Sequence, residues 1–283
     1  MSAPTGILSI QSAVSYGHVG NSAAVFPLQR LGFEVWPVNT LQFSNHPGYG
    51  AWRGRIFEPA LIADLVEGMV ERGALAACAG LLSGYLGDPA TGEIVRRTAT
   101  RLKAVNPAAL WCCDPVMGDS GSGLYVRPGI PEFFRERAMP AADIVTPNRF
   151  ELEQLTGCSI DSLAGALAAA DRLRAMGPLV ILVTSLERGD AVEMLALDDQ
   201  SAWVVVTPRL PIEVNGAGDA AAALFLGHFL KTRNVEASLG ATASAIFAVI
   251  EVTRRAGARE LQLIAAQDEI VAPTRRFTPL RLR

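Results

Sequence analysis

A short glycine-rich segment near the C-terminal end carries the residues best suited to chemistry. Residues 215–219 read Asn-Gly-Ala-Gly-Asp and run directly into the apolar stretch Ala220–Leu230, which predicts a buried helix. The glycines permit a tight turn at the start of that helix. The amide N–H groups of Gly216, Ala217 and Gly218 could therefore converge on one anion. Asp219 would lie beside that anion, and an anion site with an adjacent base is suited to phosphoryl transfer onto a hydroxyl. The structural alternative is a turn that only caps a core helix, with Asp219 offsetting the helix dipole.

Two further carboxylates follow predicted strands. Asp114 comes directly after the apolar run Leu110–Cys113, and a carboxylate at a strand end commonly holds a hydrated magnesium ion in phosphoryl-transfer enzymes. Glu151 stands three residues after Asn148, which is the spacing of a helix capping box. Because that helix would start at the carboxyl edge of the sheet, Glu151 could cap it and also face the waters of a bound metal ion.

Three polar or aromatic loops follow the first three predicted strands, at residues 11–22, 42–52 and 82–88. The second contains three aromatic residues and His46 among glycines, and the third offers Tyr85, which together suit a wall against a flat heterocycle. The structural alternatives are a helix N-cap by Asn21 or Ser22 in the first loop, and aromatic residues that pin the second loop to the core. The sequence contains no P-loop, no protein-kinase signature and no histidine-rich zinc motif, so an anion site would have to be the late Gly-Ala-Gly-Asp segment.

The elements that would position these residues alternate between strands and helices. We expect buried strands at Gly6–Ile10, Phe33–Val38, Leu75–Ala79, Leu110–Cys113, Ile144–Thr146 and Leu179–Thr184. Helices are expected at Asn21–Leu31, Glu58–Arg72, Thr91–Val105, Pro131–Arg137, Phe150–Thr156 and Ser162–Met176, and at the end of the chain at Gly218–Lys231, Val235–Arg254 and Glu260–Ile270. This alternation predicts an α/β fold with a mostly parallel central sheet and helices on both faces, while Ala191–Ala196 and Ala202–Val206 predict an antiparallel hairpin at the sheet edge. No linker or repeat interrupts the pattern, so we expect a single domain over residues 1–283.

Composition excludes several classes of protein. Half of the 283 residues are hydrophobic and the net charge is −3, with no basic run longer than two residues, which argues against nucleic acid or a membrane surface as a partner. The longest apolar runs fall short of the roughly 18–20 residues of a membrane span, and the first six residues have no basic segment, so no signal peptide is expected. The four cysteines have no metal-ligand spacing and two of them are adjacent, which suggests a cytoplasmic protein with reduced thiols.

Taken together, the motifs resemble the ribokinase-like superfamily and, within it, the pyridoxal kinases, essentially end to end. The Gly-Ala-Gly-Asp segment speaks only for the superfamily. The stretches that point to the vitamin B6 branch are residues 11–24, residues 26–32 and Ser83-Gly84-Tyr85, supported by 42–46 and 113–118.

The resemblance implies ATP- and Mg²⁺-dependent phosphorylation of the 5′-hydroxymethyl group of pyridoxal, and also of pyridoxine and pyridoxamine, by a homodimer. It implies that Asp219 is the base, that the amides of Gly216, Ala217 and Gly218 stabilise the transferring phosphate, and that Asp114 and Glu151 act through Mg²⁺ and its waters. The nucleotide would be bound by these two carboxylates and by four further residues, Asp119, Thr146, Asn148 and Thr184. The substrate would be bound by Asp219 with six others: Ser12, Val19, Phe43, His46, Pro47 and Tyr85.

Three departures from the family pattern bear on binding. Pro47 has neither an N–H nor a hydroxyl, so a polar contact from that position is lost. Residues 207–214, expected to border the nucleotide, are short, and Asn215 stands where a hydroxyl or small apolar residue is usual. Two alternatives stay open: a hydroxymethylpyrimidine kinase of the same superfamily, and a non-catalytic protein that binds vitamin B6.

Overall fold

Six strands run parallel in the middle of one sheet, because their apolar side chains are buried between two layers of helices. In the computed structural model, which describes residues 5–283, they are β1 (Gly6–Val14), β2 (Glu34–Phe43), β4 (Cys78–Ser83), β5 (Leu110–Cys113), β8 (Ile144–Val145) and β9 (Val180–Arg188). Residues 1–4, on which part of the signal-peptide expectation rests, lie outside the described residues.

Antiparallel strands close both edges of this sheet, whose order is β12-β11-β10-β9-β8-β5-β4-β1-β2-β3. The edge strands are β3 (Gly54–Ile56) on one side, and β10 (Ala191–Leu197), β11 (Ala202–Pro208) and β12 (Leu280–Arg281) on the other. A separate two-stranded ribbon, β6 (Gly118–Asp119) and β7 (Gly123–Leu124), follows β5. The predicted mostly parallel sheet with an antiparallel hairpin is therefore confirmed.

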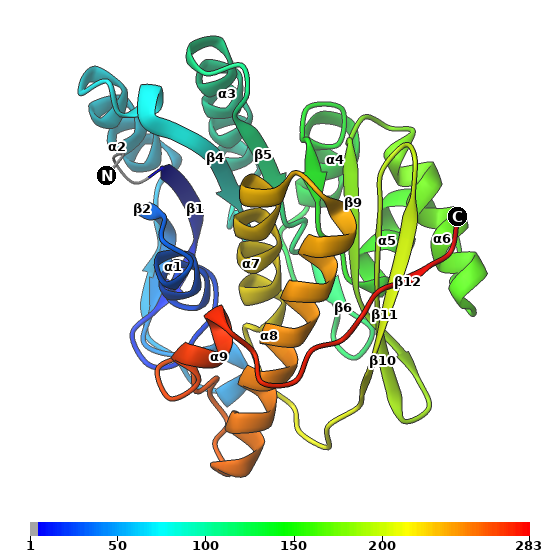
Figure 1. The fold of residues 1–283 in the computed structure, drawn as a ribbon. Helices are drawn as coiled ribbons and strands as arrows, with labels where there is room; N and C mark the ends of the chain where they lie inside the picture. Colours follow the sequence, from blue (N-terminus) through cyan, green and yellow to red (C-terminus); the bar gives the residue numbers. More distant parts are fainter. Residues whose placement is uncertain (1–4) are drawn as a thin grey trace.

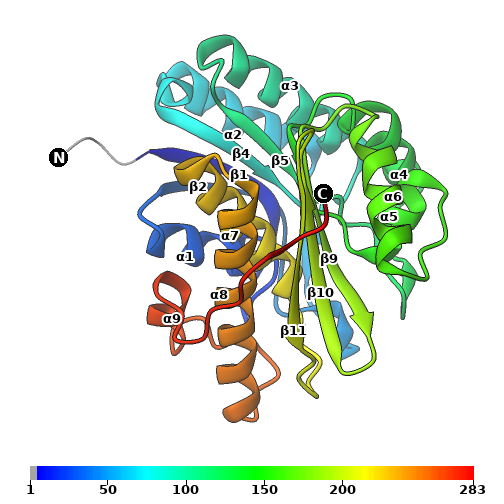
Figure 2. The ribbon, with the colours of Figure 1, turned by 45° about the vertical axis from the view of Figure 1, so that its right-hand side comes forward.

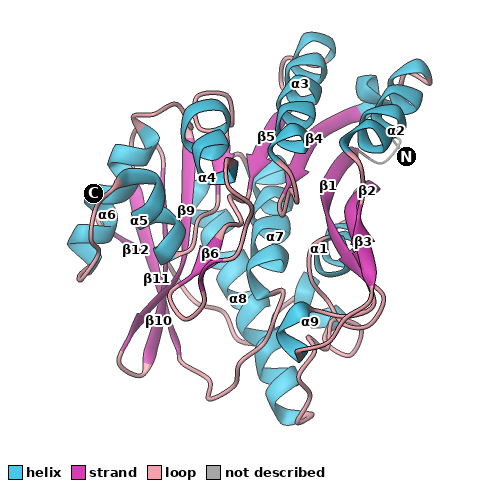
Figure 3. Cartoon of the chain, turned by 180° about the vertical axis from the view of Figure 1, so that it is seen from behind, coloured by secondary structure: helices cyan, strands magenta, loops and turns pink. Residues whose placement is uncertain are grey.

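Helices cover both faces of the sheet (Figures 1 and 2). One face carries α1 (Asn21–Arg30), α7 (Ala217–Thr232), α8 (Val235–Arg255) and the short α9 (Gln267–Val271). The other face, which is turned toward the viewer in Figure 3, carries α2 (Pro59–Glu71), α3 (Pro89–Val105), α4 (Ile130–Phe133), α5 (Arg149–Thr156) and α6 (Leu163–Arg174).

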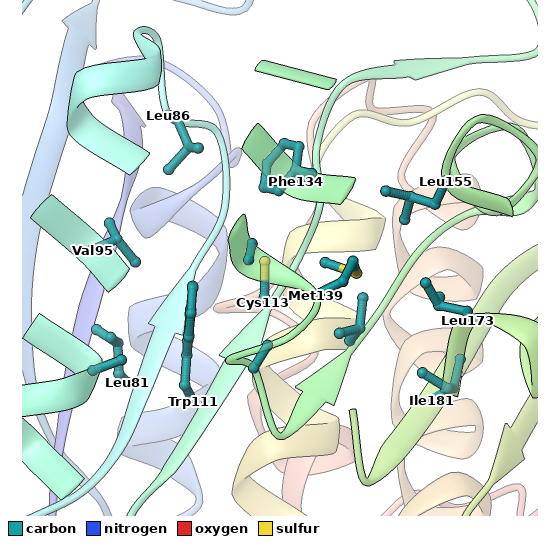
Figure 4. Close-up of a cluster of buried hydrophobic side chains, with 14 of the residues drawn as sticks. Leu81, Leu86, Val95, Trp111, Cys113, Phe134, Met139, Leu155, Leu173 and Ile181 are labelled. Carbon is teal, nitrogen blue, oxygen red and sulfur yellow. The ribbon is translucent and has the colours of Figure 1, made fainter. Parts of the chain in front are cut away.

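Neighbouring residues of one strand contribute to opposite cores, as the two-residue period of a strand requires. Leu81 packs in the core under α2 to α6, while Leu82 packs in the core under α1, α7 and α8. Figure 4 shows the first of these cores around Trp111 and Phe134, two of the largest fully buried side chains. Among residues 5–283, α8 is the one helix long and apolar enough to cross a membrane, and 67% of its apolar window is buried inside the molecule, as in a core helix.

Several predicted boundaries were wrong. The third strand was expected at Leu75–Ala79 but begins at Cys78, because residues 74–77 form a 3₁₀ turn and the pairing with β1 starts at Gly6↔Cys78. The last helix was expected at Glu260–Ile270, yet only Gln267–Val271 is helical, and residues before it form turns. The expected helix at Pro131–Arg137 is one α-helical turn followed by a π-helical turn.

Two strands run further than expected, and this moves residues of the expected loops into the sheet. β1 continues to Val14 and β2 to Phe43, so Gln11 and Ser12 are strand residues. The predicted hairpin forms β10 and β11, but β12 pairs outside it, so the hairpin does not itself form the edge. The carboxyl ends of the parallel strands still meet at one edge of the sheet, which is where the expected site residues gather.

Candidate active site

The glycine-rich segment forms the start of α7, as predicted. Gly216 is the N-cap residue with φ +81°, a conformation that favours glycine. A Cβ atom at Gly216 would lie 1.8 Å from the carbonyl oxygen of His18, so the loop after β1 packs directly against this turn. Gly218, in contrast, has nothing within 4 Å of a built Cβ, so open space lies in front of the first amides of α7. This is the geometry of an anion site at a helix N-terminus.

Asp219 lies in the first turn of α7 and is half-buried. Burial raises the pKa of its carboxyl above the usual value, against opposing contributions from a hydrogen bond with the backbone of Gly20 and from the charge of His46. A carboxylate with a raised pKa is a stronger base than an exposed aspartate.

Asp114 and Glu151 are almost fully buried, and both carboxyls are close enough to Asp219 to be affected by its charge. Asp114 accepts a hydrogen bond of 3.0 Å from the hydroxyl of Thr146. Glu151 accepts hydrogen bonds from the backbone N–H groups of Met117, at 3.0 Å, and Asn148, at 2.9 Å. The side chain of Asn148 accepts from the N–H of Glu151 in return, so the predicted capping box of α5 is present.

Burial and mutual repulsion favour the neutral, protonated forms of Asp114 and Glu151. The pKa of Asp114 is raised well above its usual range, first by burial and then by the charges of Glu151 and Asp219. Burial raises the pKa of Glu151 to about 8, with a smaller contribution from Asp219 and with backbone hydrogen bonds opposing it. Three carboxyls therefore act on one another at the start of α7, and a cation would relieve their repulsion.

The donor set fits a hydrated Mg²⁺ ion. Asp114 and Glu151 supply oxygen ligands only, and Mg²⁺ keeps several waters while binding one or two carboxylates and substrate phosphates. Within residues 5–283, no group of three or more histidine, cysteine or acidic side chains is placed to hold a metal ion.

A cavity of about 780 Å³ opens on one side of the α7 N-terminus. Five of the expected residues line it: Asp119, Asn148, Thr184, Ala217 and Gly218. Residues 207–214 border it as well, at Thr207–Leu210 and Ile212–Val214. Thr146 does not line the cavity but holds Asp114 from behind.

An apolar cluster lies near the ends of β1 and β2 and meets the start of α7, where a Cβ at Gly216 would lie 3.3 Å from Val19 Cα. It contains Val19 and Phe43 with Val14 and Leu41, and Tyr85 packs against it. The hydroxyl of Thr40 donates to the backbone oxygen of Tyr85 at 2.7 Å and fixes the start of that loop. The three apolar residues expected to enclose a ring are thus brought together.

His46 and Pro47 lie in the loop after β2. The Nδ1 atom of His46 accepts a hydrogen bond of 3.1 Å from the N–H of Gly48. Burial lowers the pKa of His46 and so favours the neutral ring, while the charges of Asp219 and Glu260 oppose the shift. Pro47 opens the 3₁₀ turn Pro47–Tyr49. Ser12 is buried next to Gly20, where a Cβ would lie 2.4 Å from the Ser12 hydroxyl.

The proteins that this chain resembles in sequence and fold are named as kinases. Residues 78–262 match the family model described as phosphomethylpyrimidine kinase. The chain is 59% identical over 280 residues to the pyridoxal kinase PdxY of Rubrobacter xylanophilus, covering 97% of this chain and 96% of that protein. It is 53% identical over 289 residues to the pyridoxal kinase PdxY of Deinococcus radiodurans, covering 99% and 97%. This chain belongs to the pyridoxal kinase family.

A solved member of the pyridoxal kinase family has the same fold. The pyridoxal kinase from Leishmania donovani, in complex with ADP and ginkgotoxin, has a TM-score of 0.93 at 29% identity, and the match covers 99% of this chain and 100% of that one. The same protein in complex with ADP and pyridoxamine gives a TM-score of 0.93 at 28% identity.

Sequence reasoning missed much of the wall of the large cavity. Four residues of α8 form one side, Ala243, Ile246, Phe247 and Ile250, and Val192 and Met194 of β10 form another. The apolar pattern of α8 is the same as that of any core helix, so nothing in the sequence marks these residues as part of a site. Tyr125, after β7, was also missed. It is 48% exposed, and partial burial and then the charges of Glu151, Asp219, Asp114 and Asp119 contribute to a raised pKa of its phenol.

Proposed function

We propose that this protein transfers the terminal phosphoryl group of ATP to the 5′-hydroxymethyl group of pyridoxal, and also of pyridoxine and pyridoxamine. The observation that carries the proposal is that the α7 N-terminus borders both regions: Ala217 and Gly218 line the large cavity, and Gly216 packs against Val19 of the apolar cluster. A nucleotide in the cavity and a flat ring against the cluster would meet at Asp219. The Leishmania relative bound to ADP and pyridoxamine supports the same pairing of ligands.

Asp219 accepts the proton of the substrate hydroxyl, because it is the one of the three carboxyls in the first turn of α7 and its raised pKa makes it more basic. The amides of Gly216, Ala217 and Gly218 stabilise the charge of the transferring phosphoryl group from the helix N-terminus. Asp114 and Glu151 would hold Mg²⁺ through its waters, and the ion would neutralise phosphate charge. Asp119, Asn148 and Thr184 bind the phosphate end of the nucleotide from the cavity wall, and Thr146 orients Asp114.

Val19, Phe43 and Tyr85 bind the faces of the pyridine ring, while Ser12 and His46 supply polar contacts and Pro47 supplies none through its backbone nitrogen. With fewer polar contacts from this loop, a larger share of the binding energy of the ring would come from contacts with its apolar faces. We therefore expect the three vitamers to differ in KM more than in kcat.

The test is formation of pyridoxal 5′-phosphate from pyridoxal and Mg-ATP by the wild type and by Asp219→Asn, with hydroxymethylpyrimidine as a parallel substrate. Loss of the base should lower kcat by about 10²–10⁴-fold with little change in the KM for ATP. Faster turnover of the pyrimidine than of pyridoxal would favour a pyrimidine kinase. Binding of pyridoxal without transfer to either substrate would favour a non-catalytic binding protein.

We also propose that the protein is a cytoplasmic homodimer with one folded domain. Its four cysteines are free, and three of them are buried, which suits a reducing compartment. Light scattering should then give about twice the mass of the 30.0 kDa chain, and a mass near that of one chain would contradict the dimer.

A further inference from the structure

The carboxylate of Glu260 lies between the two loops that carry the proposed substrate residues. The first loop is residues 15–20, after β1, and the second loop is residues 44–53, after β2. Glu260 Oε2 accepts the backbone N–H of His18 at 3.0 Å, and Oε1 accepts the hydroxyl of Tyr49 at 2.6 Å. Glu260 itself is only 8% exposed, whereas its two partners are partly exposed, so both contacts are partly buried.

Both loops fit closely around this carboxylate. A Cβ at Gly17, whose φ is +94°, would lie 2.1 Å from Glu260 Oε2, so the first loop can approach it only because residue 17 is glycine. The guanidinium of Arg259 lies 4.6 Å from the ring centroid of Tyr49. Two consecutive residues therefore contact Tyr49: Arg259 packs on its ring and Glu260 accepts its hydroxyl. The hydrogen bond to Glu260 is the largest cause of the raised pKa of that phenol.

The segment that carries Glu260 is itself fixed to the core. Leu261 and Leu263 are fully buried against α1, α7 and α8. The N–H of Gln262 donates to the hydroxyl of Thr253 on α8 at 3.0 Å. Glu260 is therefore a rigid point on the scaffold to which two separate loops are attached.

The first loop packs against the start of α7, and the second comes near enough for Asp219 to affect the pKa of His46. The carbonyl oxygen of His18 lies against Gly216, so closely that a Cβ there would be 1.8 Å away. In the second loop, the charge of Asp219 acts on the ring of His46. Movement of either loop would change the surroundings of the proposed base.

We propose that Glu260 is a positioning residue for the reaction, which holds the two loops together over the substrate ring and against the N-terminus of α7. This inference rests on the proposed kinase function. Glu260 acts through His18 and Tyr49, and its contribution is to keep Val19, Phe43 and His46 in place around the pyridine ring.

The test compares Glu260→Gln and Tyr49→Phe with the wild type and with a matched control, Glu251→Gln. Glu251 is an acid on α8 whose one ion pair within residues 5–283 is the i,i+4 pair with Arg255, so its change should leave the kinetics unaltered. Loss of the charged acceptor in Glu260→Gln should raise the KM for pyridoxal about 10-fold or more and lower kcat by a smaller factor. The KM for ATP should stay within about twofold, because neither loop lines the large cavity.

A merely structural role of Glu260 would give a different pattern. It would reduce the fraction of folded enzyme, and so lower kcat, without separating the two KM values. The double variant Tyr49→Phe/Glu260→Gln should be little worse than Glu260→Gln alone. Both substitutions affect the same hydrogen bond, so their effects should not add. Trypsin should also cut faster after Arg53, which is exposed in the second loop, in both single variants but not in the control.

The two proposals fail in distinguishable ways. An active wild type with an unchanged pyridoxal KM in Glu260→Gln would overturn the positioning role and leave the kinase function standing. A wild type without turnover would overturn the kinase function, and this inference with it.

Discussion

At the scale of single residues, two glycines at the start of α7 are required for different reasons. Gly216 has a positive φ and a backbone oxygen 1.8 Å from its built Cβ, whereas Gly218 has nothing within 4 Å. The first glycine is therefore a requirement of the fold, and the second leaves room for a ligand. The sequence motif presents both as one Gly-Ala-Gly unit and does not separate these roles.

Replacing each glycine by alanine should separate stability from binding. Gly216→Ala should lower the free energy of unfolding by roughly 2–4 kcal/mol, because it combines an unfavourable φ with a backbone clash. Gly218→Ala should leave that free energy unchanged or slightly higher, since alanine is the better helix former, yet raise the KM for ATP because the methyl group enters the cavity. Urea denaturation and steady-state kinetics measure the two effects. Equal loss of stability in both variants would contradict this division.

The positions of the three carboxylates that we propose for catalysis could be predicted from the sequence, because each follows a strand or opens a helix within a few residues. Asp114, Glu151 and Asp219 come from three distant segments, yet parallel strands bring their carboxyl ends to one edge. Glu260 could not be predicted in this way. It is 242 residues from His18 in the chain, and it lies in a turn segment that the apolar pattern had suggested was helical.

At the scale of elements, long periodic segments were predicted well and short ones were missed. The parallel strands and the helices α1 to α3 and α5 to α8 follow from buried apolar runs and helical patterns, with errors mainly at their ends. The strands β3, β6, β7 and β12 were missed because two or three residues are too few to show a period. The 3₁₀ turn Ala74–Ala77 was taken for strand, because a short apolar run does not distinguish the two.

The wall of the large cavity offers a test of how elements far apart in the sequence share one ligand. Val192 of β10 lines the cavity, while Val206 of β11 lies outside it and is 43% exposed. Val192→Trp should fill part of the cavity and raise the KM for ATP about 10-fold, with the KM for pyridoxal unchanged. Val206→Trp makes the same substitution in the same hairpin and should leave both constants near their wild-type values. A larger effect on pyridoxal than on ATP in Val192→Trp would show that the nucleotide is bound elsewhere.

At the scale of the whole molecule, one sheet separates two cores and belongs to both. Alternate residues of the same strand enter opposite cores, as Leu81 and Leu82 do. Neither core could persist without the sheet. We therefore predict that the chain unfolds as one unit, which is the behaviour that a single domain over residues 1–283 would give. Trp36, Trp111 and Trp203 lie on β2, β5 and β11, so tryptophan fluorescence reports on strands across the sheet.

A titrating group on α7 should therefore affect the stability of the entire molecule. Burial, and then Lys231, lowers the pKa of His228 to about 4, from an ordinary value near 6.5. Between pH 6.5 and 4 this histidine is protonated in the unfolded chain but neutral in the folded chain. Its contribution to stability is therefore complete above pH 6.5 and is lost as the pH falls toward 4, by roughly 1–3 kcal/mol. In His228→Gln the loss over this interval should be smaller by that amount, whatever the variant's stability at pH 7. Urea unfolding followed by fluorescence and by far-UV circular dichroism should give coincident single transitions at each pH. Two separated transitions, or equal pH slopes for the variant and the wild type, would mean that α7 is not coupled to the rest of the fold in this way.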